Sequence, residues 1–337
     1  MGGIVPTRFD REGIGAGAKS DHGPQDSPAA GEVAPVPPPT SPSPTELRVS
    51  HPKPLLSVAL VGCLLPFAAR AADDTFDSNG VRIRYVAEGK GEAVVFIHGW
   101  MSDSGMWGKL SAKDGDGYRL IALDCRGHGK SDKPHAADKY DAEVAADVVR
   151  LLDHLKVEKA HLIGYSSGAY VAGKVAATHP DRVLGVVFGG QAPVIGEVKE
   201  SDFSEVETFA KLVDEGKDLG GYVQAVFPGG DKLTDEQAQK IAKFLYAGKD
   251  VKAFAAAGRG YKHLAVTEAD LKKCKAPMLF VHGGNESDHV KNKVAAARKA
   301  LGRGELKVIA GADHTSTLAN PEFGKAITEF LKANKAK

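Results

Sequence analysis

Short runs of apolar residues recur along the chain after about residue 72 and alternate with stretches of helical periodicity. The first run, 81–86, has a period of two and follows Asn79-Gly80, which predicts an early antiparallel hairpin. The later runs are continuous and suit strands that are buried on both faces of a parallel sheet. They span 93–97, 120–123, 161–163, 183–188, 278–281 and 306–309.

Amphipathic stretches lie between these runs. Within 144–155 the apolar residues share one helical face, and charged residues such as Asp147 point away from it. Within 323–331 the same pattern follows Asn320-Pro321, which is a helix-start signal. This alternation predicts an α/β fold in which right-handed crossovers build a doubly wound, mostly parallel sheet covered by helices.

One interval is much longer than the others. Between Gly190 and Pro277 no strand-like run of comparable strength occurs, but 203–213 and 235–246 have helical periodicity. A structureless loop of this length is uncommon within a compact domain. We therefore expect a helical lid at about 191–272, inserted between the sixth and seventh strands of the sheet.

The N-terminal region lacks the residues of a hydrophobic core. Eleven of the 18 prolines lie among the first 54 residues, so 1–50 is predicted to be a disordered extension. The next segment, 51–71, contains an apolar run too short to span a membrane and ends in an Ala-x-Ala site. This pattern is typical of a secretory signal cleaved after Ala71, and lipoprotein processing at Cys63 is the weaker alternative. We expect an exported protein, periplasmic or secreted, whose folded domain spans 72–337.

Charge and cysteine content narrow the classes of partner. Lys and Arg total 44 against 43 Asp and Glu, a formal net charge of +1, which argues against a nucleic-acid partner. Cys125 and Cys274 are predicted to be buried thiols, although a single disulfide between them remains open. The chain has no CxxC pair and no dense cluster of metal-ligating residues, so we expect no metal and no cofactor. The oligomeric state is not predicted.

The strongest chemical signal is Gly164-Tyr165-Ser166-Ser167-Gly168, which lies between a predicted strand and a helix-compatible stretch. A nucleophile at a sharp strand-to-helix turn requires small residues two positions before and after it. The hydroxyl then stands exposed at the carboxyl edge of the sheet, and the following helix directs its positive end toward a developing oxyanion. We predict that Ser166 is the nucleophile and that the Ser167 N–H lies in the oxyanion hole.

A serine hydroxyl needs a base that accepts its proton and a carboxylate that orients this base. His314 follows the last predicted strand and precedes the final helix, which places it at the same edge of the sheet and makes it the expected base. The acid should lie in the loop after the preceding strand. That loop contains Glu286 and Asp288, and the spacing of the residues does not decide between them.

From about Thr75 to Lys332 the chain resembles the α/β-hydrolase superfamily. Besides the elbow, His98-Gly99-Trp100 resembles its oxyanion loop, and 124–132 is similar to its Asp-x-Arg-Gly-x-Gly-x-Ser loop. The resemblance implies an eight-stranded sheet and a serine-dependent, lid-bearing member of the esterase or lipase kind. It also implies that the Trp100 N–H completes the oxyanion hole.

The same resemblance favours Glu286 as the acid. Family members carry the acid three residues after a strand-ending glycine, here Gly283, and a glutamate is permitted there. Asp288 would then be the N-cap of the next helix, with no chemical role. Trp100 and three neighbours of the predicted site are candidates to contact substrate; these three are Met101, Trp107 and Tyr165.

The predicted function is hydrolysis of a small or medium-sized ester or related acyl compound through an acyl-enzyme on Ser166. A cofactor-free haloperoxidase or perhydrolase activity uses the same triad in related proteins and stays open. A non-catalytic protein that uses the hydrolase fold to bind a small ligand is the alternative of a different class. The expected partner is in each case a small molecule.

Overall fold

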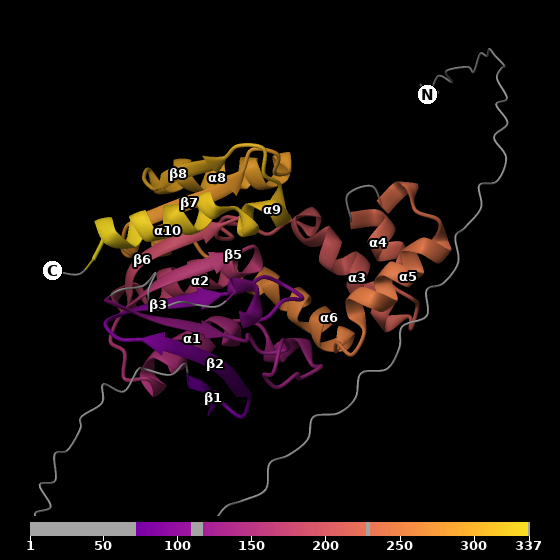
Figure 1. Ribbon diagram of the computed structural model, residues 1–337, viewed down its shortest axis with the longest axis horizontal. Helices are drawn as coiled ribbons and strands as arrows, with labels where there is room; N and C mark the ends of the chain where they lie inside the picture. Colours follow the sequence, from indigo (N-terminus) through magenta and orange to yellow (C-terminus); the bar gives the residue numbers. More distant parts are fainter. Residues whose placement is uncertain (1–71, 109–116, 227–229, 336–337) are drawn as a thin grey trace, which may run out of the picture. The chain divides into compact units, whose positions relative to one another are not determined.

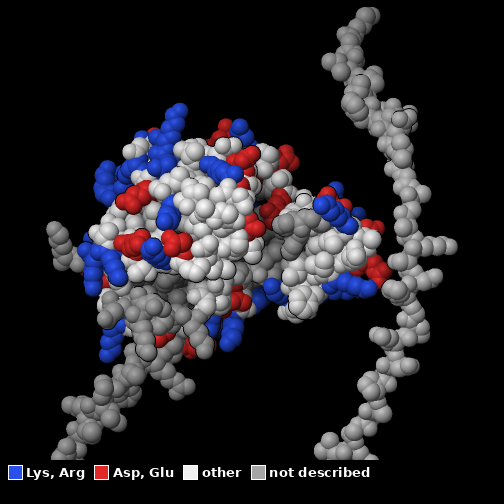
Figure 2. Space-filling model, turned by 45° about the horizontal axis from the view of Figure 1, so that its top comes forward, with Lys and Arg blue, Asp and Glu red and all other residues white. Residues whose placement is uncertain are grey.

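The computed structural model describes residues 72–108, 117–226 and 230–335. The extension expected at 1–50, the signal segment expected at 51–71 and Cys63 lie outside these ranges. No helix within the described ranges is long and apolar enough to cross a membrane. Figure 2 shows positive and negative side chains mixed over the face that it displays, in keeping with the small net charge.

The described residues form one eight-stranded sheet in the order β1-β2-β4-β3-β5-β6-β7-β8, and this confirms the predicted fold class (Figure 1). β1 pairs antiparallel with β2, and β2 with β4, whereas the pairs from β4 through β3 to β8 are parallel. Every predicted run lies within a strand, except that Val81 of the run 81–86 precedes β2. The strands are β1 (Ala72–Asp77), β2 (Arg82–Gly89), β3 (Glu92–Ile97), β4 (Tyr118–Leu123), β5 (Ala160–Tyr165), β6 (Val183–Gly189), β7 (Met278–Gly283) and β8 (Glu305–Ile309).

Helices cover both faces of the sheet. One face packs on α1 (Glu143–His154), α2 (Ser167–Thr178), α7 (Glu268–Lys273) and α8 (Asp288–Leu301). The other face packs on α10 (Pro321–Ala333), which begins after the Asn320 cap, as the sequence predicts. The short α9 (His314–Ala319) connects β8 to α10. Successive residues of the central strands therefore enter two separate apolar clusters.

Two local expectations are wrong. The run 306–309 was expected to be buried on both faces, but β8 is an edge strand, and 39% of Leu306 and 46% of Val308 is exposed. Asp147 was expected to point away from the core, yet its residue is 0% exposed. Its carboxylate accepts two hydrogen bonds from Arg126, at 2.6 and 2.7 Å, and one from Ser78 at 2.5 Å. An internal ion pair therefore compensates for its burial.

A group of helices occupies the interval between β6 and β7. We call residues 191–277 the helical insertion; it contains α3 (Ser204–Asp214), α4 (Gly220–Val226), α5 (Asp235–Tyr246), α6 (Val251–Gly260) and α7. Figure 1 shows the first four of these helices gathered beside the sheet. They share an apolar cluster of their own, to which Trp100 and Met101 of the core also belong.

The cysteines Cys125 and Cys274 are both buried and free. Burial raises the pKa of each thiol. Both side chains therefore act as small apolar groups at neutral pH.

Candidate active site

Ser166 occupies a strained bend between β5 and α2. Its backbone has φ 54° and ψ −125°, in the left-handed region that non-glycine residues rarely adopt. The Ser166 N–H donates to the carbonyl oxygen of Gly189 across 2.8 Å, which ties the bend to the neighbouring strand β6. Such strain persists only where the surrounding structure enforces it, and it concentrates at functional sites.

The glycines on either side of Ser166 are required by close backbone contacts. A Cβ atom at Gly164 would lie 2.3 Å from the carbonyl oxygen of Gly168. A Cβ atom at Gly168 would lie 2.1 Å from the carbonyl oxygen of Ile97. Both obstacles are main-chain atoms, one in α2 and one in β3, and they cannot rotate aside. The spacing of the motif is thus a consequence of how tightly the turn is packed.

His314 and Glu286 meet across the loops that follow β8 and β7. The Nδ1 atom of His314 lies 2.9 Å from Oε2 of Glu286. Because an ionised carboxylate only accepts hydrogen bonds, Nδ1 carries the proton and Nε2 keeps a free lone pair. The Glu286 side chain is 5% exposed and that of His314 is 41% exposed, so the acid is covered while the base remains accessible.

Asp288 lies apart from this pair. Its side chain is 92% exposed and contacts Lys291 on its own helix at 3.3 Å. The N-cap of α8 is Ser287, whose hydroxyl accepts from Val290 N at 3.3 Å, so the capping role expected for Asp288 is wrong. Asp288 is instead the first helical residue, where a negative charge suits the helix dipole.

Contacts around Tyr165 and Gly190 bring the base to the nucleophile's edge of the sheet. The hydroxyl of Tyr165 donates to the carbonyl oxygen of His314, and the centroids of the two rings are 5.4 Å apart. A Cβ atom at Gly190 would lie 3.1 Å from Cε1 of His314 and 2.9 Å from Cζ of Tyr165. Tyr165 directly precedes Ser166. The structure therefore places Ser166, His314 and Glu286 in one region at the carboxyl ends of the parallel strands.

The loop after β3 approaches Ser166 closely. A Cβ atom at Gly99 would lie 3.0 Å from Cβ and 3.6 Å from Oγ of Ser166. Trp100 comes next, and its indole N–H donates to the carbonyl oxygen of Phe254 in α6 across 2.8 Å. The indole ring also makes edge-to-face contacts with aromatic rings of the insertion, namely Phe209, Tyr222 and Tyr261. The predicted oxyanion loop is thus held between the nucleophile and the insertion.

The side chain of His98 connects this loop to the loop after β4. Its Nε2 accepts from the Cys125 N–H at 2.9 Å, which leaves Nδ1 to donate to the Gly99 carbonyl oxygen at 2.7 Å. Burial lowers the pKa of His98. A neutral imidazole that is hydrogen-bonded at both ring nitrogens suits a structural role better than proton transfer.

The other predicted substrate contacts lie in different surroundings. Met101 accepts a hydrogen bond at its sulfur from the hydroxyl of Tyr246 at 3.5 Å, so it faces the insertion as Trp100 does. Trp107 packs on Phe96 in the cluster on the α10 side of the sheet. Tyr165 is only 3% exposed. Tyr246 and Tyr261 also meet the core from the insertion, but no local motif in the sequence marks either of them.

The loop from Asp124 onward supports the site through buried polar contacts. Asp124 accepts from the Ser104 and Lys130 N–H groups, each at 2.8 Å. Burial acts to raise the pKa of Asp124, but these hydrogen bonds and the charge of Arg84 outweigh it, and the net pKa is lowered. No cluster of three metal-ligating side chains occurs among the described residues. The hydrogen bonds of Asp124 thus link the loop after β3 to the loop after β4.

The chain matches known proteins over its folded part. The sequence profile of the alpha/beta hydrolase fold matches residues 92–218. The 2-(acetamidomethylene)succinate hydrolase of Mesorhizobium japonicum is 31% identical over 285 residues, which cover 80% of this chain and all of that protein. The chain belongs to the α/β-hydrolase fold family.

Other members of the α/β-hydrolase fold family that resemble this one have different activities in their names. An epoxide hydrolase of Caballeronia sordidicola is 29% identical over 255 residues, 75% of this chain and 74% of that one. A bromoperoxidase structure from Bacillus anthracis aligns with a TM-score of 0.62 at 26% identity, covering 77% of this chain and all of that one. This protein is a hydrolase of the same fold, and the reaction that it catalyses depends on its own residues.

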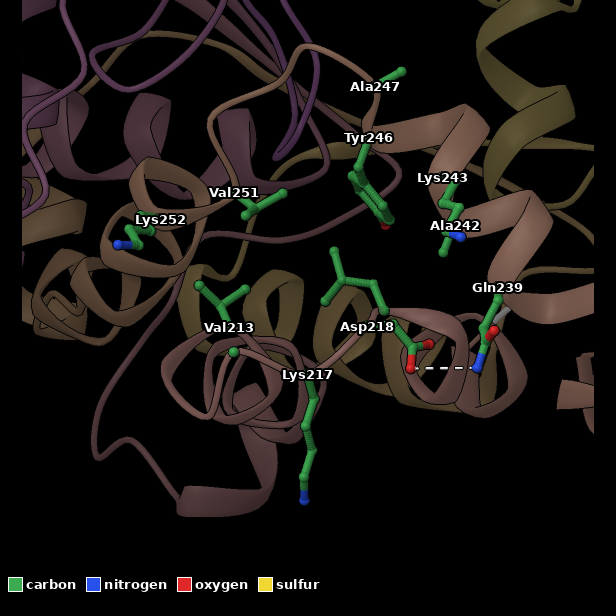
Figure 3. Close-up of a pocket in the computed structure, with 12 residues that line it drawn as sticks. Val213, Lys217, Asp218, Gln239, Ala242, Lys243, Tyr246, Ala247, Val251 and Lys252 are labelled. Atoms are coloured by element: carbon green, nitrogen blue, oxygen red, sulfur yellow. Dashed lines mark hydrogen bonds between the residues drawn. The ribbon is translucent and has the colours of Figure 1, made fainter. Parts of the chain in front are cut away.

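A cavity of about 490 Å³ lies within the insertion of this α/β hydrolase (Figure 3). Tyr246 and Val213 point into it, whereas Lys217 and Lys252 point away. Of the residues that line it, Tyr246 contacts the predicted site, through Met101. The size of the cavity falls in the range of small-molecule sites, but the predicted triad residues Ser166, His314 and Glu286 are not among those that line it.

Proposed function

We propose that this protein is a serine hydrolase that cleaves a small or medium-sized ester or a related acyl compound. The observation that carries the proposal is the 2.9 Å hydrogen bond between His314 and Glu286 beside the strained Ser166. A base oriented by a covered carboxylate, near a half-buried serine hydroxyl at a sharp turn, is the arrangement that makes serine nucleophilic.

In the first half of the reaction, Ser166 Oγ attacks the carbonyl carbon while Nε2 of His314 takes the hydroxyl proton. Glu286 holds the imidazole in the tautomer that leaves Nε2 free and stabilises the imidazolium that forms. The tetrahedral intermediate collapses, the C–O bond to the leaving alcohol breaks, and His314 donates its proton to that alcohol. In the second half, water attacks the acyl group with His314 again as base, which releases the acid and restores Ser166.

The negative charge on the carbonyl oxygen needs donors during both halves. Ser167 is the first residue of α2, so its N–H has no partner within the helix and lies at the positive end of the helix dipole. We assign this N–H and that of Trp100 to the oxyanion hole. The close approach of Gly99 to Ser166 supports the second assignment.

The insertion is proposed to act as the lid over this site. Its contacts with the core include the two residues after Gly99, through the bond from Trp100 to Phe254 and the contact of Met101 with Tyr246. Substrate that reaches Ser166 passes close to these side chains. We therefore propose Trp100 and Met101 as substrate contacts, and the chemistry requires no cofactor.

The activities of the relatives mark the main alternatives. Family members that open epoxides use an aspartate nucleophile, and Ser166 stands at that position here, which argues against epoxide hydrolysis. A perhydrolase-like reaction uses the same serine acyl-enzyme and replaces water with hydrogen peroxide. Formation of a peracid from an ester and hydrogen peroxide would therefore indicate perhydrolase activity in addition to hydrolysis.

The test is hydrolysis of p-nitrophenyl acetate by the wild type and by Ser166→Ala. We expect the substitution to lower kcat by at least about a thousandfold, because the nucleophile and its acyl-enzyme are lost. A wild type that binds small esters without releasing p-nitrophenol would instead indicate a ligand-binding protein. Equal turnover by the two proteins would contradict the assignment of Ser166.

We further propose that the protein is exported and cleaved after Ala71. Within the described residues β1 pairs with β2 from Ala72 to Asp77, and cleavage after Ala71 removes none of these pairs. N-terminal sequencing of the protein from the medium or periplasm should begin at Ala72. An intact chain that starts at Met1 in the cytoplasm would contradict export.

A further inference from the structure

Tyr165 links the backbone of the nucleophile to the backbone of the base. It is the last residue of β5 and is followed at once by Ser166. Its side chain crosses to the start of α9, where the hydroxyl donates to the carbonyl oxygen of His314. Burial, and then the charge of Glu286, raises the pKa of Tyr165, so the phenol keeps its proton and remains a donor at neutral pH.

The ring of Tyr165 is fixed on more than one side. It packs edge-on against Phe323 of α10 at a centroid distance of 5.4 Å, with an angle of 83° between the planes. It lies against the imidazole of His314 at the same centroid distance and a 45° angle. Gly190 fills the remaining side, where a Cβ atom would meet both rings at about 3 Å. The ring therefore has little freedom to move independently of the base.

We infer that Tyr165 is a positioning residue for His314, and this inference rests on the proposed serine hydrolase function. Glu286 holds the imidazole at a single atom, Nδ1, while the His314 side chain is otherwise 41% exposed. The loop before His314 is tied to the loop after β7 by hydrogen bonds from Asn285 to the carbonyl oxygens of Gly311 and Ala312, but neither bond reaches His314 itself. The Tyr165 hydroxyl supplies a second contact, on the His314 main chain. The nucleophile and the residue that positions the base are therefore neighbours in the sequence at the end of β5.

The aromatic ring has a second effect on the protonated base. His314 becomes an imidazolium when it accepts the serine proton, and a cation over the face of an aromatic ring, within about 6 Å of its centroid, is stabilised by that ring. The titratable groups that contact the His314 side chain are Glu286 from the loop after β7 and Tyr165 from β5. Of these, Tyr165 acts through its ring and not through a charge.

Tyr165→Phe separates the hydroxyl from the ring. The variant keeps the packing against Phe323 but loses the bond to the His314 carbonyl. We expect kcat for p-nitrophenyl acetate to fall by about tenfold while KM stays within about twofold, because orientation of the base affects the chemical step more than binding. The rate of labelling by a fluorophosphonate should fall by a similar factor.

Tyr140→Phe is the matched control. Tyr140 is also fully buried, and its hydroxyl also donates to a loop carbonyl, that of Pro134 at 2.5 Å. It makes no contact with His314 among the interactions of the described residues. We expect its kcat to stay within about twofold of the wild type, even if both variants lower the melting temperature. A loss of kcat in both variants alike would mean that any lost buried hydroxyl has this effect, and would overturn the inference.

Tyr165→Leu tests the ring and serves as the second variant. Without the aromatic face, kcat for p-nitrophenyl acetate should fall by a further factor of about three relative to Tyr165→Phe, since the imidazolium that forms in the chemical step is less stabilised. Equal kcat values for the two variants would overturn the effect assigned to the ring.

The outcomes for the two proposals are distinct. If the wild type is neither labelled by the fluorophosphonate nor active on the ester, the serine hydrolase proposal fails. If the wild type is labelled at Ser166 and Tyr165→Phe is labelled at the same rate with the same kcat, the serine hydrolase proposal stands and the positioning role of Tyr165 is refuted.

Discussion

Glu286 reaches the Nδ1 atom of His314 at 2.9 Å, although the two residues stand on separate loops. The second oxygen of Glu286 accepts the backbone N–H of Ser287 at 3.1 Å. The carboxylate is thereby held at both oxygens, and its 5% exposure keeps water from competing for them. This local order distinguishes Glu286 from Asp288, which projects into solvent.

Replacement of these two acids should give opposite results. Glu286→Gln keeps the shape of the side chain but can hold the wrong tautomer of His314, so we expect kcat to fall by about a thousandfold or more. Asp288→Asn is the matched control and should leave kcat within about twofold. Steady-state hydrolysis of p-nitrophenyl acetate measures both. A larger loss in Asp288→Asn than in Glu286→Gln would transfer the acid role to Asp288.

Two helical glycines should differ sharply in their tolerance of alanine. Gly168→Ala would bring a Cβ atom to 2.1 Å from the Ile97 carbonyl oxygen, so the helix or strand must shift. We expect it to abolish ester turnover and to lower the free energy of unfolding by several kcal/mol. At Gly324 in α10 a Cβ atom would meet nothing within 4 Å, and Gly324→Ala should raise that free energy by up to about 1 kcal/mol. Urea unfolding followed by circular dichroism compares the two, and equal effects would contradict the packing described at the elbow.

Local sequence patterns predicted most of the fold, since each strand of a buried parallel sheet is a continuous apolar run. They failed at Asp147 in α1, because Arg126, the partner that compensates its burial, lies in the loop after β4. They failed similarly at β8, because an apolar run does not show whether a strand has neighbours on both sides. The relation of Tyr165 to His314 joins positions 149 residues apart, and no periodicity reports such a contact.

The buried histidine His128 predicts how stability varies with pH. Burial, and then the neighbouring His98, lowers the pKa of His128 to about 3, and its Nε2 has no hydrogen-bond partner. The unfolded chain binds a proton at this residue near pH 6.5, whereas the folded chain does not, so stability falls as the pH drops below about 6.5.

Substitution of His128 by Phe should remove this contribution. Between pH 7.5 and 5, we expect the free energy of unfolding of the wild type to fall by about 2 kcal/mol more than that of His128→Phe. Phenylalanine can keep the stacking on Phe254, whose ring lies 5.0 Å away. Denaturant unfolding at several pH values measures the difference. A constant difference between the proteins over this range would show that His128 is protonated in the fold.

The internal ion pair of Arg126 and Asp147 should dominate the stability of the loop beneath the site. Both side chains are 1% exposed, and Asp147→Ala leaves the guanidinium buried without its partner. We expect a loss of about 3–5 kcal/mol in the free energy of unfolding. Asp153→Ala on the same helix is the control, because Asp153 is 60% exposed in its pair with Arg182 and should cost less than about 1 kcal/mol. Similar losses in the two variants would contradict the assigned burial.

The most direct test of the account is the site of covalent modification by a fluorophosphonate. The wild type, treated with the reagent, digested and mapped by mass spectrometry, should carry one phosphonyl group on Ser166. Prior substitution of His314 by Ala should slow the modification strongly, because the hydroxyl then has no base. A wild type that remains unmodified, or that is modified at a serine other than Ser166, would contradict the proposed mechanism.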